Sequence, residues 1–352
     1  MKLLEDLCLA VSPSSKEGDA INVWDQFMED QAKNPMISLQ HYYTDKIGNS
    51  VWKYSGEGEN KTKILISAHI DTVCGRVTKI TDKGTLMFSQ SAGICLKSLV
   101  SGNVIVCAGD KRIPGVVQKQ ALHLDTDRKK LGDWLDFRIN IGAKDKKQAE
   151  EFGVFPGALI IYRPEIETNF GNGYIRGTGL DDKGGVWIVA KVLEKLAGMR
   201  YDAKNYDIYF GAATQEETGL NGAKRMARNI NPDISIDIDC TFADTELCGS
   251  EFKDLDINLG DGALIAYGPE KSERLCTLFR EQARVNEIPA KTYTTRAGGT
   301  NTKSFQDFAG DCECGLLSFG LLSMHSSNEI VKKSDLENIV DLITSTIISG
   351  KL

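Results

Sequence analysis

Five strand-like segments of this chain end in residues that bind divalent metals, and this repeated arrangement constrains the fold more than any other feature. The candidate ligands at or just beyond these strand ends are His69, Asp181, Glu217, Asp239 and His325. Open α/β sheets place their ligands at the carboxyl ends of the strands, so one site can collect all five. Two imidazoles and several carboxylates form the ligand set of zinc-type two-metal hydrolases. The pattern therefore predicts an α/β metallohydrolase.

Taken singly, each segment also has an ordinary explanation. His69 can be an incidental loop residue, and Asp181 before a glycine pair suits a helix N-cap. The adjacent Glu216 and Glu217 suit a solvated turn, although buried like charges at a strand end would repel without a cation. A lone His325 beside an apolar strand suits a satisfied core histidine. One metal site explains all of them together, and we prefer it.

The chain pattern predicts an α/β domain interrupted by a smaller one. An apolar strand over 63–68 leads to His69, and beyond Thr72 about a hundred residues consist of short β-rich pieces between Gly, Lys and Asp turns. The α/β pattern then returns, with a helix over 184–196 and strands over 207–214, 234–239 and 315–322. We expect a catalytic α/β domain, with a mixed central sheet flanked by helices, from 1–73 and 170–352. Residues 74–169 are expected to form an inserted β-rich domain of barrel or PDZ-like type.

Composition excludes some function classes. A net charge of −7 argues against nucleic acid as an obligatory partner, and no apolar run reaches membrane-spanning length. Nine cysteines without framework spacing fit free thiols in a reducing compartment, which predicts a cytoplasmic protein.

The motifs, in this order, resemble those of the M42 family of dinuclear aminopeptidases. The matching segments are Ala68-His69-x-Asp71, Asp181-Asp182-Lys183-x-Gly185, Gln215-Glu216-Glu217-x-Gly219-x-x-Gly222-Ala223, Asp239, Gly298-Gly299-Thr300, and His325-Ser326 followed by Glu329. The resemblance implies two divalent ions per subunit, zinc or cobalt before manganese. It assigns His69, Asp181 and Asp239 to one ion and Glu217, Asp181 and His325 to the other, with Asp181 bridging.

The chain departs from the family pattern at a few positions, and three alternatives stay open. Lys183 stands where the family usually has Arg or Asn, Asn301 replaces a common Asp, and the Arg that often precedes the His is missing before His325. An M20-like peptidase or deacylase shares the metal ligands, but its inserted domain lies just before the last His. An endoglucanase would need two carboxyls on opposite sides of the scissile bond, at least about 5 Å apart, and an inactive metal-binding assembly protein would need no general base.

The expected reaction is hydrolysis of the N-terminal peptide bond of a short peptide by a metal-bound water. Glu216 would be the general base and Asp71 would orient His69. The resemblance also implies a homo-oligomer, a dimer through the inserted domain and then a tetrahedral dodecamer. Short strands in the insert predict uncovered sheet edges, which favour such pairing.

Overall fold

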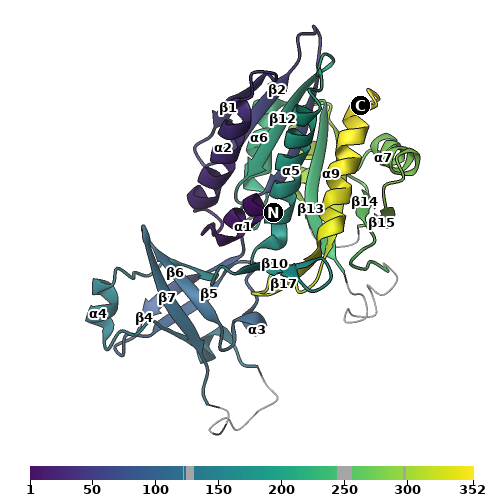
Figure 1. Cartoon of the computed structure of the whole chain (residues 1–352). Coiled ribbons are helices and arrows are strands. Elements are labelled where there is room, and N and C mark those ends of the chain that lie inside the picture. Colours follow the sequence, from purple (N-terminus) through teal and green to yellow (C-terminus); the bar gives the residue numbers. More distant parts are fainter. Residues whose placement is uncertain (122, 124–130, 244–255, 296–298) are drawn as a thin grey trace.

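The computed structural model describes residues 1–121, 123, 131–243, 256–295 and 299–352. Within these ranges an α/β part carries a separate small barrel, and a short three-stranded sheet lies where the two parts meet (Figure 1). No helix in the described ranges is both long enough and apolar enough to cross a membrane.

The main sheet is mixed, as predicted. Among the described residues it has eight strands, in the spatial order β1 (Leu39–Thr44), β2 (Ser50–Ser55), β12 (Tyr206–Ala213), β3 (Thr62–His69), β13 (Ile234–Phe242), β16 (Glu313–Leu321), β14 (Ala263–Tyr267) and β15 (Ala290–Thr294). The central strands β12, β3, β13 and β16 run parallel, and β2 and β14 join them antiparallel. The central strands are buried almost throughout, which explains their near-continuous apolar sequences.

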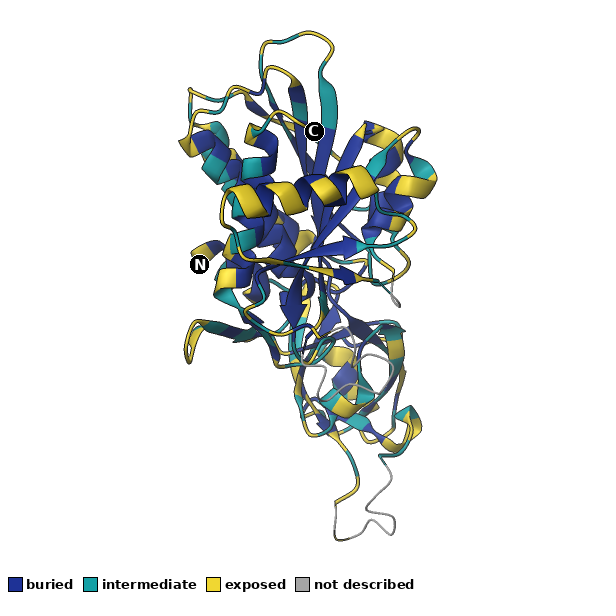
Figure 2. Ribbon diagram, turned by 90° about the vertical axis from the view of Figure 1, so that its right-hand side faces the viewer, coloured by how far each residue is buried: buried dark blue, intermediate teal, exposed yellow. Residues whose placement is uncertain are grey.

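Helices cover both faces of this sheet (Figures 1 and 2). Buried side chains place α1 (Lys2–Leu9), α2 (Gly18–Ala32), α5 (Leu180–Gly198), α7 (Glu273–Val285) and α9 (Lys333–Ile348) over one face, and α6 (Asn221–Ile230) and α8 (Asn301–Phe308) over the other. Alternate residues of β3 supply the two cores: Ile64 and Ile66 pack toward α5, whereas Leu65 packs toward α6.

The inserted segment forms a closed barrel with its own core. Within the described residues its strand order is β4 (Cys74–Ile80), β5 (Leu86–Ala92), β8 (Arg138–Asn140), β7 (Lys111–Gln118), β6 (Asn103–Ala108) and β9 (Leu159–Tyr162), and β9 pairs back with β4. The helices α3 (Leu96–Leu99) and α4 (Lys146–Glu151) and the 3-10 turn η2 (Trp134–Asp136) connect these strands. Because the barrel is closed, the uncovered edges expected for this segment are absent from these strands, and that argument for association was wrong.

A three-stranded sheet joins the barrel to the α/β part. Its strands are β10 (Ile166–Phe170), β11 (Tyr174–Gly177) and β17 (Glu329–Lys332), with β11 in the centre. β10 begins inside the 74–169 segment and ends one residue beyond it, and it pairs with β11 rather than with the barrel. Gly177 pairs with Glu329, so this small sheet ties the start of α5 to the segment after β16.

Candidate metal centre

The register of the parallel strands brings the first candidate ligands to one level. His69 is the last residue of β3 and pairs with Ala213, the last residue of β12. On the other side of β3, Asp237 pairs with Ser67, so Asp239 lies two residues further along at the height of His69. The loops that follow β12 and β16 carry Glu217 and His325 and leave from the same edge.

Asp181 reaches this edge from the first turn of α5. Gly179 precedes the helix with φ 71°, in the left-handed region that favours glycine. The paired glycines permit close packing of that turn, since a Cβ on Gly184 would lie 2.7 Å from the ring of Phe319. A Cβ on Gly185 would lie 2.4 Å from the carboxylate of Asp182. The Asp-Asp-Lys-Gly-Gly sequence therefore allows two buried carboxylates beside a tightly packed helix start.

The five predicted ligands lie close together. Asp181 connects the two imidazoles: its Oδ1 lies 3.1 Å from His69 Nε2, and its Oδ2 lies 3.4 Å from His325 Nε2. Glu217 Oε1 lies 3.4 Å from the same nitrogen of His325. Asp239 groups with Asp181 and with His69 in clusters whose potential ligand atoms lie within 4.8 Å of one another.

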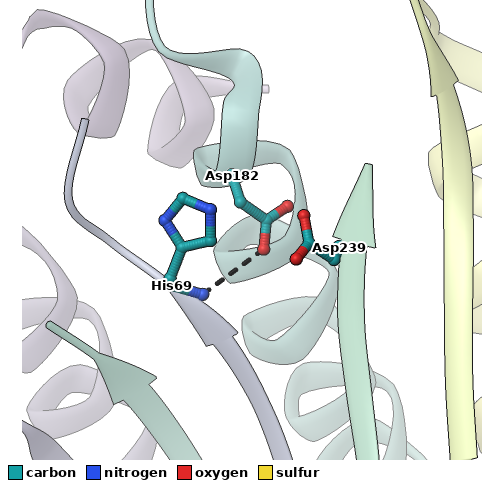
Figure 3. A group of neighbouring side chains, drawn as sticks. All are labelled: His69, Asp182 and Asp239. Atoms are coloured by element: carbon teal, nitrogen blue, oxygen red, sulfur yellow. Dashed lines mark hydrogen bonds between the residues drawn. The ribbon is translucent and has the colours of Figure 1, made fainter. Parts of the chain in front are cut away.

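Two residues that the sequence reasoning did not assign also lie in these clusters. Figure 3 shows Asp182 from the first turn of α5 between His69 and Asp239, and Cys240 groups with Asp181 and Asp239. Each carboxylate oxygen of Asp182 already accepts a backbone N–H, from His69 at 3.3 Å and from Gly185 at 3.1 Å. Asp182 therefore joins β3 to α5. The carboxylate of Asp239 faces Asp182 in Figure 3, and its Oδ1 accepts the Cys240 N–H at 2.8 Å.

The charges of the cluster fit a divalent cation. Burial raises the pKa of Glu217 and Asp239 well above the usual range, and neighbouring carboxylates raise both further. Burial also opposes ionisation of Asp181, but hydrogen bonds from His325 and His69 outweigh it and lower its pKa. Glu217 Oε1 is buried and has no hydrogen-bond partner among the residues that the structure describes. An oxygen-rich group of this kind, with an unbonded buried oxygen beside imidazoles, fits the ligands that zinc-type metal ions accept.

Asp71 connects this cluster to the loop that carries Glu216. Its Oδ1 accepts the Glu216 N–H at 3.0 Å, and its Oδ2 accepts the Glu217 N–H at 3.2 Å. Oδ1 also lies 3.5 Å from His69 Nδ1, and the Asp71 carbonyl oxygen lies 3.2 Å from that nitrogen. Burial, followed by repulsion from Asp239 and Asp71, raises the pKa of Glu216 to about 8 against the opposing effect of His69.

His325 is held by groups from three parts of the chain. Glu329 Oε1 accepts the His325 N–H at 3.0 Å, and Glu329 Oε2 accepts the Asp181 N–H at 3.2 Å. From the barrel, the Gly93 carbonyl lies 3.2 Å from His325 Nδ1, and the Tyr162 hydroxyl donates to the His325 carbonyl at 3.0 Å. These contacts direct Nε2 toward the cluster. Apart from Glu329, which belonged to a quoted motif, nothing in the local sequence marks these residues.

A cavity of about 270 Å³ opens beside the cluster. One side consists of the candidate ligands and Glu216, and the other includes Thr241, Glu270, Lys271 and Tyr293. Lys183 does not line this cavity; it is buried against the N-terminal segment and donates to the Ala10 carbonyl at 3.1 Å. Gly298 of the predicted motif lies outside the described residues.

Comparisons with known proteins identify the family of this chain. A family model described as M42 glutamyl aminopeptidase matches residues 48–342. A lysyl aminopeptidase of Pyrococcus furiosus is 27% identical over 306 residues, which cover 85% of this chain and 84% of that protein. A glutamyl aminopeptidase of Lactococcus lactis is 28% identical over 248 residues, which cover 68% of this chain and 67% of that protein.

Solved structures of other peptidases share the fold of this chain. The TET1 peptidase of Pyrococcus horikoshii superimposes with a TM-score of 0.83 at 28% identity, and the match covers 98% of each chain. An aminopeptidase of Desulfurococcus kamchatkensis has the same fold, with a TM-score of 0.88 at 24% identity over 100% of this chain and 97% of that one. The family match favours the M42 interpretation over the M20 alternative. The chain belongs to the M42 family of aminopeptidases and is a peptide hydrolase.

Proposed function

We propose that this chain is an aminopeptidase that depends on two divalent metal ions and removes N-terminal residues from short peptides. The observation that carries the proposal is the convergence of two imidazoles and four carboxylates on one cavity. These side chains are His69, Asp181, Glu216, Glu217, Asp239 and His325.

Asp181 is placed to serve both ions. Its two oxygens face different imidazoles, that of His69 and that of His325, as a bridging carboxylate requires. We therefore assign His69, Asp181 and Asp239 to one ion, and Glu217, Asp181 and His325 to the other. Zinc and cobalt suit this nitrogen and oxygen set best, with manganese as the third candidate.

Glu216 is proposed to move the proton. It borders the cavity but is absent from the candidate metal groups of the described residues. When bound, divalent cations supply the Lewis acidity that activates water and polarises a carbonyl. Glu216 takes the proton of the attacking water and delivers it to the leaving amine, while Asp71 holds the Glu216 backbone and the His69 ring.

The size of the cavity supports a small substrate. About 270 Å³ is just below the range of sites for drug-sized ligands, so the terminal residue of a flexible peptide fits better than a folded chain. One metal ion of a dinuclear site can bind a free α-amine, which would account for action at the N-terminus.

The test is Glu216→Gln, which retains size and hydrogen bonding but removes the base. We expect kcat to fall by roughly two to four orders of magnitude, the usual contribution of a general base, with both metals retained. Activity is measured on aminoacyl p-nitroanilides with zinc, cobalt and manganese in turn, and metal content by atomic absorption. Glu29→Gln makes the same chemical change on an exposed part of α2 and serves as control. A Glu216→Gln enzyme with wild-type kcat would refute the assigned role.

We further propose a closed homo-oligomer, a dimer through residues 74–169 and a dodecamer as its larger form. The related TET1 peptidase can assemble into a tetrahedron or a large octahedral shell. Exposed apolar side chains on this chain's inserted segment support an interface there: Val116, Leu135 and Phe155 are 43%, 66% and 49% exposed.

Light scattering after size-exclusion chromatography tests the assembly. With metal present we expect a multimer, and Leu135→Asp should shift it toward the monomer while leaving the fold intact. Met199→Asp, a matched change at an apolar side chain 53% exposed outside the barrel, is the control. A wild-type monomer at micromolar concentration would exclude the proposal.

We also propose a cytoplasmic location. The described cysteines are free thiols, which supports a reducing compartment.

A further inference from the structure

The loop that carries Glu216 is held by two carboxylates from different parts of the chain. Asp71 accepts the N–H groups of Glu216 and Glu217. The preceding N–H, of Gln215, donates at 3.1 Å to Oε1 of Glu17. Three successive backbone N–H groups therefore donate to carboxylate oxygens, and Glu17 provides the first of these acceptors.

This loop needs partners of that kind. β12 ends at Ala213 and α6 begins at Asn221, so the N–H groups of Gln215, Glu216 and Glu217 lie between the two elements, although the Gln215 carbonyl accepts the Asn221 N–H at 3.1 Å. Gln215 has φ 57°, in the left-handed region, a strained conformation for a residue other than glycine that persists only where neighbours enforce it. Glu17 accepts the N–H of the Thr214–Gln215 peptide, one residue before Glu216, and so helps to hold the backbone from which the Glu216 side chain leaves.

Glu17 is itself rigidly placed. Its side chain belongs to the buried residues just before α2, and its Oε1 also accepts the Ser15 N–H at 2.6 Å. The segment before it is bonded to the loop of Asp71, since Thr72 N donates to Ser12 O at 2.9 Å and Ser14 N donates to Thr72 O at 3.1 Å. The N-terminal segment thus contacts both loops that carry the proposed chemistry.

The protonation state of Glu17 suggests what the contact requires. Burial and the nearby charge of Asp71 raise its pKa to about 8. A largely protonated carboxyl group at neutral pH still offers Oε1 as an acceptor. The contact therefore depends on the reach of an oxygen atom and not on a negative charge.

We propose that Glu17 is a positioning residue for Glu216, acting through the hydrogen bond from the Gln215 peptide. The inference rests on the proposed function, in which Glu216 moves the proton. Glu17 is not among the described residues that line the cavity.

Two substitutions separate the reach of the oxygen from the presence of a carboxyl group. Glu17→Gln keeps an acceptor oxygen at the same distance, whereas Glu17→Asp keeps the carboxyl group but withdraws the oxygen by about one methylene length. We expect Glu17→Asp to lower kcat 10- to 100-fold, the size that a misplacement of about 1 Å can produce, with KM within about twofold and metal content unchanged. Glu17→Gln should stay within about threefold of wild type, and Glu29→Asp on the exposed face of α2 is the control.

Hydrogen exchange at the peptide containing the Gln215 amide gives a second readout. Exchange should accelerate in Glu17→Asp and not in Glu17→Gln or the control. If Glu216→Gln abolishes activity but Glu17→Asp matches the control in kcat and exchange, the inference falls and the proposed function stands. A loss of metal in Glu17→Asp would also overturn it, because the role would then be support of the metal site. An inactive wild-type enzyme would refute the proposed function and this inference with it.

Discussion

Replacing Gly93 by alanine tests whether the barrel orients His325. Gly93 has φ +63°, and its carbonyl lies 3.2 Å from His325 Nδ1. A Cβ at this position would lie 2.9 Å from both Nδ1 and Cε1 of the imidazole. Since carbon atoms pack best at about 3.5–4.0 Å, the ring must withdraw by roughly half an ångström or more and weaken its bond to the Gly93 carbonyl.

The substitution has two separable costs. The left-handed backbone costs an alanine about 1–2 kcal/mol, which lowers the stability of the fold. Loss of a partner that orients a metal ligand typically weakens metal affinity 10- to 100-fold, or about 1.4–2.7 kcal/mol. Gly109 isolates the first cost, since it has φ +61° in the same barrel and a Cβ there would meet nothing within 4 Å.

Unfolding in denaturant and competition with a chromophoric chelator measure the two costs. Both variants should lose stability in the metal-free state, Gly93→Ala the more because its Cβ would also lie 3.0 Å from Val73 Cγ1, and only Gly93→Ala should lose affinity for one of the two metals. Equal metal affinity in Gly93→Ala and Gly109→Ala would refute the reasoning, because His325 would then bind no metal or need no support from the barrel.

Two further predictions concern pH and substrate preference. Burial raises the pKa of Glu17 and of Asp237 to about 8, so the folded metal-free protein keeps protons that the unfolded chain loses near pH 4. Its free energy of unfolding should therefore fall as the pH rises from 5 to 8, by up to about 1.4 kcal/mol per pH unit for each group. A free energy of unfolding that rises over that range in urea titrations would contradict the assignment. Lys271 borders the cavity but is ion-paired with Glu270. Glu270→Gln should raise kcat/KM for N-terminal glutamate at least tenfold relative to leucine, and an unchanged ratio would exclude this pair from specificity.

The sequence pattern predicted the elements that carry the proposed ligands, because an apolar run followed by a polar residue marks the end of a buried parallel strand. The runs at 63–68 and 207–214 correspond to β3 and β12 within one residue at each end. The relative heights of the ligands along the sheet could not be predicted, because they depend on the register between strands, such as the pairing of Ala213 with His69. A barrel or PDZ-like insert was expected from its short β-rich pieces, and the barrel is confirmed, but the strand pair that closes it, β4 with β9, is distant in the sequence and could not be predicted.

Local sequence signals did not predict the start of the last helix or the role of Glu17, because both depend on tertiary contacts. A capping box from Ser334 to Glu337 would start the last helix at Ser334. α9 instead begins at Lys333, and its N-cap Lys332 makes no side-chain hydrogen bond. β17 ends at Lys332 and α9 begins at the next residue, so the helix starts directly at the end of a sheet strand and not after a capped loop. Glu17 was missed for a related reason: its role depends on a bond across 198 positions to Gln215.

The supporting bonds imply that the metal centre belongs to the whole fold. Asp71 holds the loop of Glu216 from within the α/β part, Glu17 holds it from the N-terminal segment, and Gly93 holds His325 from the barrel. His69 and Asp239 sit on neighbouring strands, β3 and β13, whereas His325 depends on contacts between the barrel and the segment before β17. A displacement of the barrel would therefore disturb His325 before it disturbs His69. Of the two proposed ions, the one bound by Glu217 and His325 should be the weaker and the more sensitive to contacts made by the barrel.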